Sequence, residues 1–517
     1  MKKTVLKFSE ILVLFLLIMT SCNKDNKVIS SGYTTLDYTK LPTDVEKIPY
    51  LKLNNWFVHA NVILNGEVLP ANSVAFNNGT NIDFYEWSEQ MFLWITSPQD
   101  STIVLETREF YTVSPPDSLK KRNLIPHHST KTLSASVNIM KLDSEEGQAG
   151  DGDVLMSKEG SLIYYITFVN DVYAQFLTAG KQDSIKYPNK KFPTTQTELD
   201  AIKAFAKGNG ETLKSPNTLS MELKTSWVDL ATIPTVNKTD YITVKANVPI
   251  YDKKIDTIWT PTGNTETKTL ALIGMHVVGS VNGHPEMIWA TFEHQHNSPS
   301  LGYKYIDANK QTRTIAADTG DNWLLNKKST DTVFNIVNMK YGKTDNAIEA
   351  KAGKTITASN TKRINAFGVA YDNDYAPNNE NNSTAASNSQ IIAINNTVRN
   401  QLIKGDVRKN YIFIGATWTQ KGAAPTGKSY SVERKQTSPG VAVGASQLAN
   451  STMETYFQYG AKKFNTSNAS CFACHSNSLH QNTPNALSHI YSELKLGTII
   501  TANSPIDSKA LATISYK

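Results

Sequence analysis

The sequence predicts an α+β fold with a β-rich body and a helical C-terminal segment. Two observations lead to this prediction. Short runs of apolar and β-branched residues, separated by turn signals, recur between residues 51 and 440. After residue 450, apolar residues recur instead at the three- and four-residue spacing of helices. We therefore divide the globular part into a body at 51–440, which has room for two subdomains, and a C-terminal segment at 441–517.

Within the body, the first expected helix buries an aromatic face. Its helical stripe consists of Phe84, Trp87, Met91, Trp94 and Ile95, and Thr96-Ser97-Pro98 ends it. A second helix is expected at 195–206, and strands at 162–169, 219–227, 241–244, 270–280 and 410–418. The stretches 371–390 and 425–439 are expected to be loops.

Two helices are expected in the C-terminal segment. Ser451 and Glu454 have the spacing of a capping box, in which each side chain bonds the other's backbone N–H group. Thr483-Pro484 is typical of a second helix start. The apolar stripe of that second helix is Leu487, Ile490, Tyr491 and Leu494.

The N-terminus predicts export. Residues 1–21 combine three lysines, a short apolar run at 11–19 and small residues before Cys22. Cysteine at that position is similar to the lipobox of bacterial lipoproteins, which implies cleavage before Cys22 and acylation of its thiol. The alternative is an ordinary signal peptide followed by an incidental cysteine. Residues 22–50 are expected to tether the protein to a membrane, on the periplasmic side or at the cell surface.

Composition argues against one class of partner. The formal net charge is +6 over 517 residues, and the lysines are dispersed. Since a nucleic-acid footprint requires a basic patch or stripe, we expect no nucleic-acid partner.

The segment from Cys471 to His475 reads C-x-x-C-H, which is the attachment motif of covalent haem c. The two thiols would form thioether bonds, and His475 would be the proximal ligand of the haem iron. A thioredoxin-like redox pair is an alternative, but no βαβ pattern precedes the motif. A zinc site is another, although only His480 is near enough in sequence to add a ligand. The fold prediction therefore includes a helical, haem-bearing C-terminal segment.

The second axial ligand is not evident from the sequence. No methionine follows His475, which excludes the arrangement of small cytochromes c. Met453 is the first candidate, and its alternative role is a core side chain that fills a gap. His480 is too close in sequence to reach the other side of the haem, and His489 is expected to face water. His276 is expected to be a core histidine.

A second stretch is dense in titratable groups. His284, Glu286, Glu293 and His294 follow a turn at Asn282-Gly283 and could form an acid/base group above a haem. The alternative is a hydrogen-bonded structural network. The stretch lacks H-E-x-x-H, so a zinc protease is not expected.

Several motifs together resemble a family of exported bacterial cytochrome c domain proteins. The resemblance covers most of the globular region. It rests on 87–94, 148–150, 222–227, 284–294, 450–458 and the haem motif at 471–475. What it implies is a single haem in a large scaffold that binds no other haem.

Three functions follow as expectations. The first is a lipid-anchored monohaem cytochrome that transfers electrons to or from a redox partner. The second is a haem oxidoreductase of peroxidase or oxygenase type that uses the group at His284–His294. The third is a surface binding lipoprotein whose haem is incidental or regulatory.

Overall fold

The computed structural model describes residues 41–77, 79–99, 102–127, 142–143, 149, 152–181, 191–342, 345–368, 382–427, 439–446, 448–458, 471–476 and 481–494. These residues all belong to one compact unit. The expected signal peptide, Cys22 and His480 lie outside the described residues, and so does most of the expected tether.

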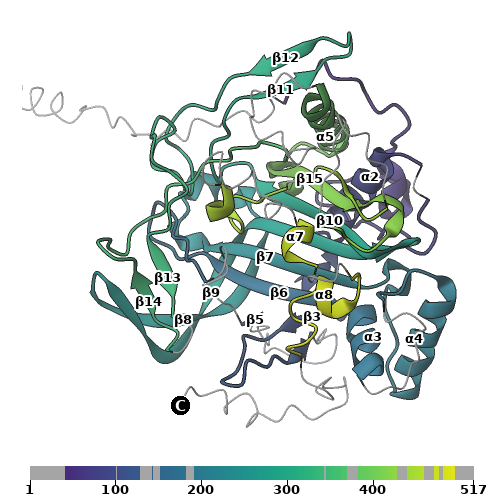
Figure 1. The fold of residues 1–517 in the computed structure, drawn as a ribbon, viewed down its shortest axis with the longest axis horizontal. Helices are drawn as coiled ribbons and strands as arrows, with labels where there is room; N and C mark the ends of the chain where they lie inside the picture. Colours follow the sequence, from purple (N-terminus) through teal and green to yellow (C-terminus); the bar gives the residue numbers. More distant parts are fainter. Residues whose placement is uncertain are drawn as a thin grey trace, which may run out of the picture. The chain divides into compact units, whose positions relative to one another are not determined.

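A large sheet of 12 strands dominates the fold (Figure 1). Its main path runs through β16 (Ala442–Gly444), β15 (Tyr411–Thr419), β10 (His284–His294), β9 (Ile258–Val281), β7 (Met221–Asp229), β6 (Tyr164–Asn170), β3 (Phe110–Val113) and β4 (Leu124–Pro126). The remaining strands are β8 (Thr243–Ile255), β5 (Leu142–Asp143), β13 (Met339–Tyr341) and β14 (Ile348–Ala350). All pairs except β5 with β8 are antiparallel. Together with the helices, this sheet makes the protein an α+β fold.

Six α-helices and two small sheets complete the described structure. The helices are α2 (Asn81–Ile95), α3 (Asp171–Lys181), α4 (Gln196–Gly208), α5 (Asn382–Gln401), α7 (Cys471–Cys474) and α8 (Pro484–Leu487). The small sheets pair β1 (Pro98–Gln99) with β2 (Thr102–Ile103), and β11 (Tyr303–Ile306) with β12 (Thr312–Ile315).

The two faces of the central strands have different chemistry. On one face α2 packs through apolar contacts, and the ring of Phe92 stacks on Phe292 of β10 at 4.3 Å. The other face carries polar side chains, among them the cross-strand neighbours Lys224, His276 and Thr291. The C-terminal segment covers this polar face, with α7 and α8 in front of the sheet in Figure 1.

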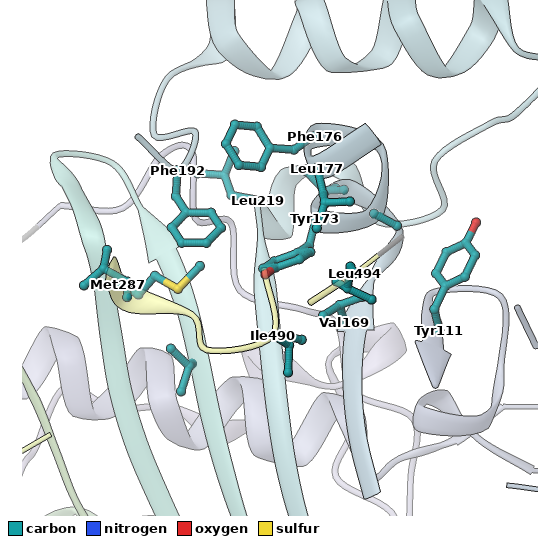
Figure 2. Packing of buried hydrophobic residues seen from close by; sticks show 14 of the residues in the cluster. Tyr111, Val169, Tyr173, Phe176, Leu177, Phe192, Leu219, Met287, Ile490 and Leu494 are labelled. Atoms are coloured by element: carbon teal, nitrogen blue, oxygen red, sulfur yellow. The ribbon is translucent and has the colours of Figure 1, made fainter. Parts of the chain in front are cut away.

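A hydrophobic cluster attaches the C-terminal segment to the body (Figure 2). Its members come from the sheet, from α3 and α4, and from the C-terminal segment, and they include Tyr173, Phe176, Phe192, Phe472, Ile490 and Leu494. Each large side chain buried in this way contributes about 1.5–3 kcal/mol relative to an exposed one. Of the predicted C-terminal stripe, Leu487, Ile490 and Leu494 are buried in this cluster, and Tyr491 is partly buried against it.

Most predicted elements of the body are confirmed, and two of the strands, β8 and β9, are longer than expected. The helices at 84–95 and 195–206 are α2 and α4, and Thr195 and Glu198 form a capping box on α4. The strands at 241–244 and 270–280 are parts of β8 and β9, which pair over a long hairpin. The loop predicted at 371–390 is wrong after residue 381, because α5 begins at Asn382.

The two helices predicted in the C-terminal segment are shorter than expected. Residues 451–454 form turns, and a 3-10 helix follows at Thr455–Gln458. Asn450 replaces Ser451 in the capping role, because the Asn450 N–H donates to Glu454 Oε2 at 2.9 Å. The Ser451 hydroxyl donates instead to Glu293 of β10. Tertiary bonds to the sheet thus replace helical bonds here.

Candidate haem-attachment site

The C-x-x-C-H motif forms the single helical turn α7. The backbone N–H of His475 donates to the carbonyl of Cys471 at 2.8 Å, which closes the turn. Phe472 points into the hydrophobic cluster and is 1% exposed. Cys471 is half-buried and Cys474 is exposed, and both thiols are free. One aromatic side chain thus fixes the turn while the cysteines lie nearer the surface.

The ring of His475 is held in a defined orientation by three neighbours. Its Nδ1 donates to the carbonyl of Leu487 at 2.7 Å. Trp289 of β10 lies 4.3 Å from the His475 ring, and His489 stacks on it at 4.1 Å with an interplanar angle of 14°. His489 is itself fixed because its Nε2 donates to the Cys474 carbonyl at 3.2 Å. His489 is exposed, as the sequence predicts, and it also contacts the motif.

Electrostatics keep the His475 ring neutral. Burial, followed by the nearby His489, lowers the pKa of His475 to about 3, and Lys224 and His276 act in the same direction. A neutral imidazole that donates from Nδ1 has a lone pair on Nε2. Nε2 makes no hydrogen bond to any described residue. It is the nitrogen that a metal would bind.

The cysteines do not have the properties of a redox-active pair. Burial raises the pKa of Cys471 and of Cys474, and the negative charge of Glu454 raises both further. Reactive C-x-x-C thiols have lowered pKa values, because the thiolate is the nucleophile. The environment of the two thiols therefore does not match that of a redox-active pair.

A small charged group lies beside the motif on the polar face of the sheet. His276 Nε2 and Glu454 Oε1 are 2.8 Å apart, and these side chains are 21% and 30% exposed. Although burial opposes ionisation, His276 and Lys224 hold the pKa of Glu454 below its usual range. The sequence analysis missed this pair because Glu454 is 178 positions from His276 in the chain.

Gly274 allows the loop that carries Glu454 to approach the sheet. A Cβ atom at Gly274 would collide with the Thr452 hydroxyl and lie 2.7 Å from Ser226 Oγ. Across the strands, Asn450 Nδ2 donates to Thr291 Oγ1 at 2.8 Å. The loop is thus fixed against β7, β9 and β10, and Glu454 is fixed with it.

The titratable residues of β10 do not form one group. At its beginning, the His284 Nδ1 and Glu286 Oε1 atoms are 2.8 Å apart, and Glu286 also accepts from the Thr419 N–H at 3.0 Å. At its end, Glu293 accepts from the Ser451 N–H at 2.7 Å, and His294 stacks on Tyr241. All four are at most 2% exposed. This geometry fits the structural network that was the alternative interpretation.

Met453, the tentative second ligand, is a core side chain. It is 1% exposed and belongs to a hydrophobic cluster with Tyr165, Ile273 and Leu325. Phe472 of the motif belongs to a different cluster. The gap-filling role is therefore the one that fits Met453.

The donor set of the motif fits a c-type haem. A metal-bound histidine almost always donates its other ring N–H to a carbonyl or carboxylate, which fixes the ring and the tautomer. The bond from His475 Nδ1 to Leu487 has this form. Cys471 and Cys474 would supply the thioether sulfurs. Among the described residues, no cluster of three or more His, Cys, Asp or Glu side chains is arranged to hold a metal ion.

No family model, curated protein or solved structure matches this chain. In the described part of the chain, no helix has both the length and the apolar character needed to cross a membrane.

Proposed function

We propose that the protein is an exported, lipid-anchored monohaem c-type cytochrome that acts in electron transfer. The observation that carries the proposal is the C-x-x-C-H turn in which His475 donates from Nδ1 to the Leu487 carbonyl and keeps Nε2 available. A hydrogen bond of this form is what fixes the ring and the tautomer of a metal-bound histidine.

In this proposal the chain's residues have separate tasks. Cys471 and Cys474 hold the haem covalently, and His475 ligates its iron. The bound haem supplies an iron that changes reversibly between two oxidation states. Trp289 and His489 restrict the rotation of the His475 ring. Phe472 anchors the turn, so the ligand keeps its position when the charge of the iron changes.

Export and lipid anchoring belong to the same proposal. In bacteria, haem is attached to cytochromes c outside the cytoplasm. Residues 1–21 would direct the export that this attachment requires. Cys22 would carry the lipid, and the protein would act in the periplasm or at the cell surface. Its partner is a one-electron donor or acceptor.

The enzymatic alternative has less support. A peroxidase or oxygenase needs an acid/base group close to an open iron position. His284 and Glu286 lie at one end of β10, and Glu293 and His294 at the other, and all four are buried in separate hydrogen-bond networks. Electron transfer requires no such group.

Haem attachment is tested by expressing the full chain with export and haem maturation. We expect one haem per chain, retained in a denaturing gel and measured as the pyridine haemochrome. Cys471→Ser combined with Cys474→Ser should abolish it. Cys22→Ser is the matched cysteine control, because it should keep the haem but lose lipid labelling and membrane association. A wild-type chain without covalent haem would overturn the proposal.

Electron transfer is tested separately on the haem protein. We expect reversible reduction and no change of the reduced spectrum with carbon monoxide. Turnover of peroxide, together with carbon monoxide binding, would favour the enzymatic alternative instead.

A further inference from the structure

We propose that His276 is the second axial ligand of the haem iron, opposite His475, and that Glu454 orients it. This inference rests on the proposed function, because it requires a haem at Cys471 and Cys474. Its evidence is independent of the C-x-x-C-H motif, since it comes from the sheet and from the loop at 450–454.

Strand register places His276 next to the ligand already assigned. His276 of β9 is the cross-strand partner of Thr291, and Val278 is the partner of Trp289. Side chains two positions apart on a strand share a face, so His276 and Trp289 are diagonal neighbours on the polar face. The Trp289 ring contacts the His475 ring at 4.3 Å. The diagonal neighbour of His276 therefore contacts the proposed ligand His475.

The hydrogen bonds of His276 match those of a metal ligand. Nε2 bonds the Glu454 carboxylate at 2.8 Å, and Nδ1 makes no hydrogen bond to any described residue. A carboxylate on the far nitrogen fixes the ring and increases its basicity as a ligand. His475 has the same arrangement with its two nitrogens exchanged, because its Nδ1 bonds Leu487.

Glu454 is fixed before any ligand binds. Its second oxygen accepts from the Asn450 N–H at 2.9 Å, and Asn450 is bonded to Thr291 of β10. The carboxylate is thus held over the two strands that carry His276 and Trp289. Both side chains nevertheless remain partly exposed, at 21% and 30%.

The other candidates among the described residues are excluded by geometry. His489 stacks flat on the His475 ring, whereas a ligand across the iron must lie beyond the Nε2 edge of that ring. Met287 and Met453 are 1% exposed within hydrophobic clusters. Four further histidines of the body, His127, His284, His294 and His296, are at most 5% exposed and lie in other parts of the core. His59 is exposed and lies in the 3-10 turn Val58–Ala60.

Two imidazole ligands would make the haem a closed, low-spin centre that carries electrons and does not bind small molecules. The test is the spectrum of the purified haem protein, with haem attachment measured separately. We expect a low-spin ferric wild type with the electron paramagnetic resonance of two histidine ligands. His276→Ala should keep its covalent haem, become high-spin and bind carbon monoxide, and added imidazole should restore the low-spin spectrum.

Two further variants keep the inference testable if His276→Ala folds poorly. His276→Met should remain low-spin with a sulfur ligand and a raised reduction potential. Glu454→Gln should keep two histidine ligands and shift the potential upward, since the carboxylate no longer increases the basicity of the ligand. His59→Asn is the matched control, because Asn tolerates the left-handed backbone of His59 (φ 63°), and its spectrum should equal that of the wild type.

The outcomes separate this inference from the proposed function. Covalent haem with a high-spin wild type would overturn the role of His276 and leave haem attachment intact. A low-spin His276→Ala variant without added imidazole would also overturn it. A chain without covalent haem would overturn both.

Discussion

Two histidine-bearing regions of the sheet differ in a way that is informative about function. The first consists of β10 and the residues just after it, where His284, Glu286, Glu293, His294 and His296 occur within 13 positions. All five are at most 5% exposed. The second surrounds His475 and contains the partly exposed pair His276 and Glu454, which distant segments supply. In this protein the region that is dense in titratable residues is a buried hydrogen-bonded region. The candidate site is the region that contains the partly exposed pair His276 and Glu454.

The reason is the free energy of burying polar groups. A buried carboxylate without hydrogen bonds is strongly unfavourable, so a sequence that buries one must also place partners around it. Glu293 illustrates this, because the Ser451 N–H and hydroxyl both donate to it and Arg363 lies 3.5 Å away. At a functional site, by contrast, a group must keep an atom available for its ligand.

The largest expected effect comes from breaking the buried network. Glu293→Ala removes the carboxylate that faces the buried Arg363 guanidinium. Loss of one member of a buried ion pair costs about 3–5 kcal/mol. We expect the free energy of unfolding, measured by urea denaturation, to fall by that amount. The protein that remains folded should keep the haem spectrum of the wild type.

The matched control for this prediction is Glu266→Ala. Glu266 is 49% exposed and pairs with Lys268, and an exposed pair of this kind contributes only about 0–1 kcal/mol. A Glu293→Ala protein of wild-type stability but with an altered haem spectrum would show that the buried network is part of the site.

An intermediate effect is expected from His296 and pH. Burial lowers the pKa of His296 to about 4, and neither ring nitrogen has a hydrogen-bond partner among the residues that the structure describes. In the unfolded chain the pKa of this histidine is about 6.5. Between about pH 6.5 and about pH 4, the histidine is therefore protonated in the unfolded chain and neutral in the folded chain. This group therefore makes the protein less stable as pH falls from 7 to 5, by about 2 kcal/mol.

The variant His296→Leu isolates that contribution. It keeps a similar volume without a titratable group, so its stability should depend less on pH between 7 and 5. His294 lies 5.3 Å away, and burial and the neighbouring His296 also lower its pKa, so part of the pH dependence should remain. Equal pH dependence in the variant and the wild type would contradict the prediction.

The smallest effect on stability is expected at Trp289, where the two regions meet. Trp289→Leu removes the aromatic contacts to His475 and Phe472, which contribute about 0.5–1.5 kcal/mol beyond the buried area. We expect a small loss of stability and a shift in reduction potential, since the His475 ring is less restricted. Unchanged potential, measured by redox titration, would show that Trp289 has no role in positioning His475.

The errors in element prediction have physical causes. α5 was assigned to a loop because its first residues are Asn and Ser, which favour turns. Its buried side chains Ala385, Ile391, Ile392, Ile394 and Val398 nevertheless follow helical spacing, and this signal identifies the helix. The C-terminal helices were predicted too long because short helices depend on tertiary packing more than on capping residues.

The sequence by itself determined the C-x-x-C-H motif on which the proposed haem attachment rests, because the spacing of two thiols and an imidazole is a local property of the chain. It also determined the α+β class and the buried stripe of the C-terminal segment, since periodicity reports which face is apolar. Only the tertiary structure decided which titratable residues form networks and which remain available. Strand register and a glycine at position 274 bring His276 and Glu454 together, although they are 178 positions apart in the chain. No local sequence pattern predicts a contact between residues so far apart.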